Sequence, residues 1–290
     1  MVDVTSDPVD DILAEYGCSG AWEPLRWTGV ANRIYATQDV VLRIATDHPE
    51  GVCDARTESV AAPVVHAAGV LTPRLLAFDD TRSLTDRPFS LWERVHGETL
   101  GLLTGEPNSM PNTWRAVGHQ LFLLHSRVSE CPDPNGYLDT DERNLDLDSL
   151  LGELVTSRRV NTATADEIGR LIEELRPRID MSVEPCFCHN DVHDMNIMCA
   201  RDDSLLAIID WGDAGWGDPT SDFYGIPLDA VPLVMEGYGS EAPGLLGDSP
   251  EVRIVWDKLN GAMEECRDHP PRPLPLGQFR AFALSGNRQP

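Results

Sequence analysis

Three polar side chains in the second half of the chain have the chemistry to hold a divalent cation. Asp191 follows a short apolar run in the stretch FCHNDVHDMN, residues 187–196, and Asn196 ends that stretch. Asp210 stands at the end of a second apolar run, LLAIID. Mg²⁺ takes carboxylate and amide oxygens as ligands and keeps phosphate oxygens as further ones. A carboxylate that stays off the metal can act as the base for a hydroxyl nucleophile.

Two apolar runs are expected to position these groups. The runs PCFCH and LLAIIDW are predicted to form two strands of a hairpin, each of which delivers a carboxylate near its end. The alternative is a buried polar turn, in which Asp191 and Asp210 accept hydrogen bonds from backbone N–H groups. Three ligand groups at this spacing favour the cation site over the turn.

The first third of the chain is rich in β-branched residues and turn signals. Residues 26–47 are predicted to form two strands joined by a polar turn, and residues 73–95 two more. Between these pairs, residues 54–70 have the composition of a helix, which Pro63 should kink or split.

The remainder of the chain is rich in helix signals. Residues 112–128 carry apolar side chains at spacings of three and four, which is typical of a helix with one buried face. Residues 165–179 are amphipathic, with Thr164 as the expected N-cap. The change of pattern falls at 93–97. We therefore expect an α+β protein of two lobes, with a ligand site in the cleft between them.

The formal net charge is -25, which limits the classes of partner. An acidic chain repels phosphate backbones, so nucleic acid is not expected as a partner. A cationic small molecule would be attracted, although the charge could equally serve only to keep the protein soluble. The first residues lack the features of a signal peptide, and no apolar run reaches the ~20 residues that span a bilayer. These features predict a cytoplasmic protein without a membrane partner.

Seven cysteines are scattered along the chain. An odd number without regular spacing argues against a disulfide framework. Cys186 and Cys188 form a C-x-C pair, but no second ligand pair follows at zinc spacing. Core thiols are therefore favoured over a metal site.

The motif H-x-D-x-x-x-x-N at 189–196, followed by I-D-W at 209–211, resembles the aminoglycoside phosphotransferase family, which shares its fold with the protein kinases. The resemblance continues through the Gly-Asp-Pro and Asp-Phe pairs of residues 217–223 and through the Leu-His that ends 117–125. It implies a two-lobed protein-kinase-like fold, with a small antiparallel sheet in an N-terminal nucleotide-binding lobe, residues 1–95. Residues 96–290 would form a mostly helical lobe with the catalytic loop and the substrate site.

The resemblance also implies roles for individual residues. Asp191 would be the catalytic base or orienting carboxylate, and Asn196 and Asp210 would hold Mg²⁺. ATP or GTP would be the phosphoryl donor, and adenine would meet the backbone at Glu93 and Val95.

The phosphate-binding part departs from the family pattern. The family has a lysine on its third strand, where this chain has Arg43, and Glu58 is the best partner for it. Arginine is longer, planar and forked, so the exchange is not neutral. Arg43 could bind the phosphates, Arg33 could do so instead, or the protein could be a binder with little turnover; the complete metal site favours Arg43. The covering loop has a single glycine, Gly29.

The family phosphorylates antibiotics and small metabolites, so the resemblance leaves the substrate open. Acidic residues near the expected site would suit a cationic, aminoglycoside-like antibiotic through charge-assisted hydrogen bonds. The candidates are Asp194, Asp213, Glu264 and Glu265. Phosphorylation of an antibiotic would confer resistance. There are two alternatives. One is a metabolite kinase for choline, homoserine or a sugar-like substrate, and the other is a pseudokinase-like binding protein with little turnover.

Overall fold

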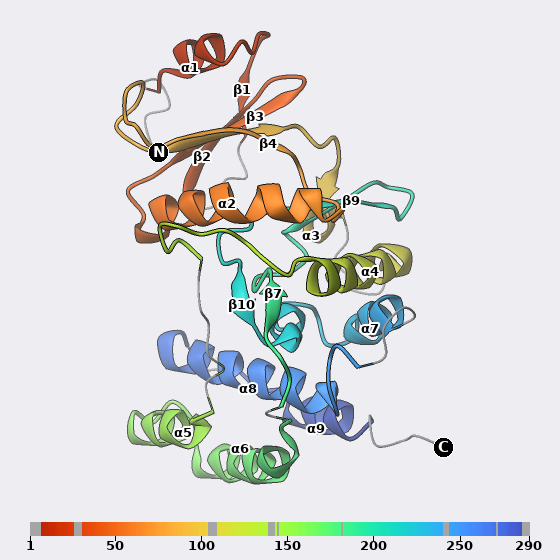
Figure 1. The fold of residues 1–290 in the computed structure, drawn as a ribbon. Coiled ribbons are helices and arrows are strands. Elements are labelled where there is room, and N and C mark those ends of the chain that lie inside the picture. Colours follow the sequence, from red (N-terminus) through yellow and green to blue (C-terminus); the bar gives the residue numbers. More distant parts are fainter. Residues whose placement is uncertain are drawn as a thin grey trace.

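The structure is a computed structural model, and it describes residues 7–25, 31–103, 109–138, 143, 145–180, 182–239, 244–270 and 272–285. Among these residues no helix is both long and apolar enough to pass through a bilayer. Gly29 lies outside the described residues. Figure 1 shows a sheet-containing N-terminal part stacked on a mostly helical C-terminal part.

The N-terminal sheet has five antiparallel strands in the order β1-β2-β3-β5-β4. They are β1 (Glu23–Pro24), β2 (Asn32–Ala36), β3 (Val40–Ala45), β4 (Leu75–Asp79) and β5 (Phe89–Glu93). The four strands predicted within residues 26–47 and 73–95 are therefore present.

The two faces of this sheet are covered by different helices. Leu42, Ile44 and Leu91 form a core with α1 (Val9–Glu15). Residues on a strand alternate between faces, so Arg43 points to the opposite face. On that side α2 (Pro49–Ala67) packs, as Figure 1 shows.

Helix α2 begins earlier than expected and continues through Pro63 without a break. The predicted split is therefore wrong. A proline inside a helix removes its own backbone hydrogen bond and crowds the carbonyl four residues before it. The buried contacts of Ala61, Ala62 and Val65 with the central core nevertheless hold the helix together on both sides of Pro63.

Helices make up most of the C-terminal part. They are α3 (Leu100–Leu103), α4 (Pro111–Arg127), α5 (Leu147–Thr156), α6 (Thr162–Leu175), α7 (Val231–Gly239), α8 (Pro250–Asp268) and α9 (Leu276–Ser285), with 3-10 turns η3 (Arg176–Arg178) and η4 (Pro219–Phe223). Helix α6 begins earlier than expected, because the side chain of Asn161, and not Thr164, caps it by accepting from the Thr164 N–H at 2.9 Å.

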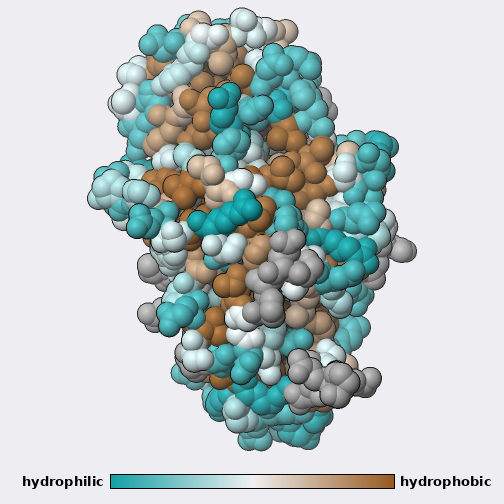
Figure 2. All heavy atoms as spheres, turned by 45° about the vertical axis from the view of Figure 1, so that its right-hand side comes forward, coloured by the Kyte–Doolittle hydropathy of each residue, from teal (hydrophilic) through white to brown (hydrophobic). Residues whose placement is uncertain are grey.

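Two hydrophobic cores hold these helices. One joins α4 and α7 to the strands around the predicted site, and the other joins α5, α6, α8 and α9. Helices α4 and α7 cross very closely, because a Cβ atom on Gly118 would lie 1.9 Å from the carbonyl oxygen of Val234. Figure 2 shows hydrophilic residues spread over the surface, with apolar residues between them.

The expected hairpin between the strands of Asp191 and Asp210 does not form. Strand β7 (Cys186–Cys188) pairs with β10 (Gly215–Gly217), while β9 (Leu205–Ile208) pairs with β8 (Ile197–Cys199), which also pairs with β6 (Glu98–Thr99). The run NIMCA forms β8 and lies only a short turn before β9. This nearby strand therefore takes the position that the sequence analysis assigned to β7.

Candidate functional site

The loop that carries Asp191 is anchored at its start by a buried carboxylate. Asp222, in η4, accepts hydrogen bonds from the backbone N–H of His189 at 2.9 Å and of Asn190 at 2.6 Å. The Nε2 atom of His125, on α4, lies 2.9 Å from the second oxygen of the same carboxylate. His125, His189 and Asp222 are all buried, so the end of the strand and the start of the loop are held in one position.

His189 fixes the next turn of the loop. Its Nδ1 accepts from the backbone N–H of Asp191 at 3.2 Å, so its Nε2 carries the proton that is donated to the carbonyl of Ile209 at 3.0 Å. The ring also packs against Trp211, with ring centroids 4.4 Å apart. His189 thus joins the loop of Asp191 to the residues beside Asp210.

Asn196 lies directly against Asp191. Its amide Nδ2 donates to the Asp191 carbonyl at 2.9 Å and to Asp191 Oδ2 at 2.8 Å. The amide nitrogen is therefore committed, and the amide oxygen accepts no hydrogen bond from the residues that the structure describes. This free oxygen is the atom that a metal ion would require of Asn196.

Asp210 is brought beside Asn196 by the pairing of β8 with β9. The backbone N–H of Ile209 donates to the Asn196 carbonyl at 2.9 Å, and Asp210 follows with a left-handed φ of 70°. That conformation is uncommon outside glycine and is found preferentially in aspartate and asparagine. It turns the chain sharply where strand β9 ends. The donor set of a free amide oxygen and an adjacent carboxylate fits a hard divalent cation.

Arg43 connects the N-terminal sheet to this site. Its Nη2 donates to Asp210 Oδ1 at 2.8 Å, and its Nη1 donates to Glu58 Oε1 at 2.5 Å. Burial would raise the pKa of Asp210, but the Arg43 guanidinium lowers it below its usual range. Burial raises the pKa of Glu58 to about 7, against the opposing effect of Arg43. The predicted Arg43–Glu58 pair is therefore present, on a buried helix face.

Arg33, the alternative to Arg43, and the lysine of the chain both lie elsewhere. Arg33 is on the α1 side of the sheet, where its Nε bonds Asp7 at 2.6 Å. The only lysine, Lys258, is buried in α8 and donates to the carbonyls of Tyr224 and Ile226 at 2.6 and 2.5 Å. Burial lowers the pKa of this lysine to about 8.

Asp213 lies beside the loop that carries Asp191. Its backbone carbonyl accepts from Asn190 Nδ2 at 2.9 Å, and burial, followed by the charge of Asp191, raises the pKa of its carboxyl. Asp194 faces α3: its carbonyl accepts from the Gly101 N–H at 3.0 Å. Both predicted substrate residues therefore lie in the loops around Asp191.

Glu93 and Val95 lie where the chain leaves the sheet. Glu93 pairs with Val40 at the end of β5 and is exposed. Within the described part of the chain, neither the backbone N–H nor the carbonyl of Val95 has a hydrogen-bond partner. A backbone with both groups open is available to the edge of a planar base.

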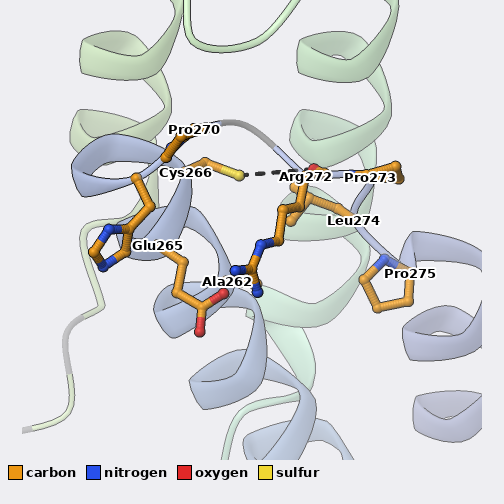
Figure 3. A pocket seen from close by; sticks show the side chains of 9 residues that line it. Ala262, Glu265, Cys266, Pro270, Arg272, Pro273, Leu274 and Pro275 are labelled. Carbon is orange, nitrogen blue, oxygen red and sulfur yellow. Dashed lines mark hydrogen bonds between the residues drawn. The ribbon is translucent and has the colours of Figure 1, made fainter.

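Glu264 and Glu265 lie further off, on the last turns of α8. Glu265 lines a surface pocket of about 300 Å³ between α8 and α9, together with Cys266, His269 and Arg272 (Figure 3). The pocket contains none of the other predicted site residues. Tyr224 is close enough to both glutamates and to Asp191 to be affected by their charges. Burial, followed by these charges, raises the pKa of its hydroxyl.

The sequence analysis gave no role to Asp222, His125, His193 or Asp54. Asp222 and His125 were noticed only as parts of motifs, and their apolar flanks were the available signal that they are buried.

His193 Nε2 lies 3.4 Å from Asp191 Oδ2. Asp54, on α2, packs on Gly212, and burial together with Asp213 and Asp210 raises its pKa to about 6.

Cys186 and Cys188 lie beside His125, so the three residues together could hold a metal ion. Their sulfur atoms are 3.7 Å apart. Both ring nitrogens of His125 are, however, already engaged, Nε2 with Asp222 and Nδ1 with the hydroxyl of Tyr238 at 2.9 Å. The hydrogen bonds therefore favour core thiols, as the sequence analysis did.

The comparisons with known proteins agree with this architecture. A family model described as "Phosphotransferase enzyme family" matches residues 22–242. The structure of spectinomycin phosphotransferase APH(9)-Ia in complex with ADP and spectinomycin has a TM-score of 0.61 and 14% identity, over 97% of this chain and 98% of that one. The GDP complex of wild-type aminoglycoside 2'-phosphotransferase-IIIa has a TM-score of 0.63 and 17% identity, over 96% of each chain.

A third structure is similar over its full length. The gentamicin complex of APH(2")-IIa has a TM-score of 0.61 and 15% identity, over 100% of this chain and 98% of that one. None of the curated proteins compared with the chain matches it. These likenesses confirm the predicted α+β, protein-kinase-like fold.

Proposed function

This chain belongs to the phosphotransferase enzyme family, and we propose that it transfers a phosphoryl group from ATP or GTP to a hydroxyl of a small, cationic, aminoglycoside-like antibiotic. The observation that carries this proposal is the group formed by Asp191, Asn196 and Asp210 with Arg43 beside it. By this reaction a cell would gain resistance to the antibiotic. We place the enzyme in the cytoplasm, where its nucleotide is found.

Asp191 is the residue that would receive the substrate proton. In the transfer, the substrate oxygen bonds to the γ-phosphorus, the bond from that phosphorus to the β–γ bridging oxygen breaks, and the hydroxyl proton passes to the Asp191 carboxylate. The amide of Asn196 holds the Asp191 carboxylate in place at 2.8 Å. His193, 3.4 Å from the same oxygen, adds positive charge when it is protonated.

Asn196 and Asp210 would hold Mg²⁺, through the free amide oxygen of the first and the carboxylate of the second. The ion would neutralise charge on the phosphate oxygens. Arg43, held by Glu58, would bind the α- and β-phosphates in the position where the family has lysine. The open backbone groups of Val95, next to Glu93, would receive the base.

Two observations support a cationic substrate. The net charge is -25, and Asp194 and Asp213 add acidic groups around Asp191. The solved structures with this fold include complexes whose names give ADP with spectinomycin, and gentamicin. Glu264 and Glu265 would contribute only if the substrate extended past Tyr224 to the last turns of α8.

The test is phosphoryl transfer with Mg²⁺, ATP or GTP, and a panel of hydroxylated compounds, followed by mass spectrometry for the added phosphate. The panel contains aminoglycosides, macrolides and cyclic peptides, together with choline, homoserine and sugars. We expect transfer to at least one cationic antibiotic. We also expect Asp191→Asn to lower turnover by roughly 10²–10⁴-fold with little change in nucleotide affinity.

Asp202→Asn is the matched control, because Asp202 is exposed in the turn between β8 and β9 and bonds, within the described part of the chain, only Ser204. It should leave turnover unchanged. Turnover of Asp191→Asn within a few-fold of the unaltered enzyme would contradict the assigned role. Nucleotide binding without transfer to any compound would point to a binding protein instead.

A further inference from the structure

Arg43 already occupies one of the two groups assigned to the metal. Its Nη2 bonds Asp210 Oδ1 at 2.8 Å, while its Nη1 bonds Glu58 at 2.5 Å. The two acids differ in exposure: the Glu58 side chain is 2% exposed and that of Asp210 is 44% exposed. Glu58 is thus the fixed partner of the guanidinium, and Asp210 is the partner that other ligands can reach.

One donor of Arg43 stays unsatisfied beside the contact with Asp210. Its Nε is buried and has no hydrogen-bond partner among the residues that the structure describes. A buried donor without a partner costs free energy. The guanidinium would recover that loss if acceptors from a ligand, such as phosphate oxygens, came within reach of the same fork.

An ion on Asp210 would compete with this contact. Mg²⁺ binds carboxylate oxygens at about 2.0–2.1 Å, so an ion on Oδ1 could lie no more than about 5 Å from Nη2. Two centres with charges of +2 and +1 repel strongly at that separation in a partly buried site. An ion on the second oxygen of Asp210 would lie farther from Nη2, but the two charges would still repel across the same carboxylate.

We propose that Arg43 keeps divalent metal off Asp210 until a nucleotide is bound, when the phosphates take over Nη2 and free the carboxylate. This inference rests on the proposed function and deepens it, since it makes metal binding depend on nucleotide binding. Glu58 keeps its hydrogen bond with Nη1 throughout, so only Nη2 changes partner.

The forked side chain is what permits this exchange. A guanidinium presents separate donors to two carboxylates at once, whereas the ammonium of lysine is a single compact charge. A lysine at position 43 would stay with buried Glu58 and bind Asp210 less firmly. We therefore expect the nucleotide requirement to be stronger in this chain than in an Arg43→Lys variant.

The experiment is a titration with Mn²⁺, in which electron paramagnetic resonance measures the free ion, without nucleotide and then with a non-hydrolysable ATP analogue. We expect Arg43→Gln to bind Mn²⁺ at least tenfold more tightly than the unaltered protein when no nucleotide is present. Arg43→Lys should show a smaller gain, and it carries the test if the loss of a cation beside Glu58 prevents Arg43→Gln from folding. Asp210→Asn should abolish the site in every background.

The matched control is Arg56→Gln, because Arg56 is on the same helix as Glu58 and pairs with Asp80 at 2.6 Å. It should leave Mn²⁺ affinity unchanged. The inference would be overturned if the unaltered protein and the Arg43 variants bound Mn²⁺ equally well without nucleotide. If they also bound the metal–nucleotide complex normally, the proposed function would still stand. Failure of the unaltered protein to bind metal even with nucleotide would overturn the proposed function as well.

Discussion

The charge of His125 predicts how the stability of this protein changes with pH. His125 is buried on α4, with its Nε2 2.9 Å from Asp222 and its Nδ1 2.9 Å from the hydroxyl of Tyr238. Burial would lower the pKa of His125, but the hydrogen bond to Asp222 raises it to about 9. The imidazolium therefore remains charged in the folded protein above the pH at which it loses its proton in the unfolded chain.

The size of the effect follows from this difference. Ordinary histidine has a pKa of about 6.5, and each tenfold change in proton affinity is worth about 1.4 kcal/mol, so the pair contributes on the order of 3 kcal/mol. Because the folded pKa is the higher one, this stabilisation is complete below pH 6.5. It falls progressively as the pH rises toward 9 and is lost above that value.

Urea unfolding followed by tryptophan fluorescence at pH 6, 7.5 and 9.5 tests this prediction. At each pH the free energy of unfolding of His125→Gln is subtracted from that of the unaltered protein. This difference should be about 3 kcal/mol larger at pH 6 than at pH 9.5. His119→Gln is the matched control, because His119 is on the same helix but contacts Phe122 and no described carboxylate. A difference between the unaltered protein and His125→Gln that does not vary with pH would refute the reasoning.

Three further substitutions have expected outcomes. Gly118→Ala should lower the free energy of unfolding by several kcal/mol, because the added Cβ would meet the Val234 carbonyl at 1.9 Å and force α4 from α7. Gly152→Ala, at an exposed α5 position with no atom within 4 Å, should instead raise it by about 0.5–1 kcal/mol; chemical denaturation of both variants checks the opposite signs. Above pH 7, where Glu58 is ionised, Glu58→Gln should weaken nucleotide binding about tenfold by removing the charge that holds Arg43, and unchanged affinity in isothermal titration calorimetry at pH 8 would contradict this.

The residues of the site could be found from the sequence because they are tied to short, strongly patterned segments. Asp191 and Asp210 follow apolar runs and Asn196 precedes one, and β8 and β9 bring Asn196 and Asp210 together by adjacent pairing. The Arg43–Glu58 pair was expected from the resemblance to the family, which has a lysine at the position of Arg43 and pairs it with a helix glutamate.

The rest depended on contacts between segments that are far apart in the sequence. Nothing near Asp191 indicates that Asp222 anchors its loop, because that contact forms only when η4 packs under β7. The hairpin prediction failed for a related reason: β7 and β9 are equally apolar, and the choice of partner was decided by β8 and β10. Pro63 was judged by its intrinsic effect alone, but packing in the core overrides it.

The central claim is that Asn196 and Asp210 hold one divalent ion next to Asp191. A crystal structure of the protein with Mg²⁺ and a non-hydrolysable nucleotide tests it most directly. We predict an ion within about 2.0–2.2 Å of Asn196 Oδ1 and of an Asp210 oxygen, with Nη2 of Arg43 moved from Asp210 to a phosphate. A nucleotide-bound ion that touches neither residue, or a nucleotide that binds away from Arg43, would contradict the claim.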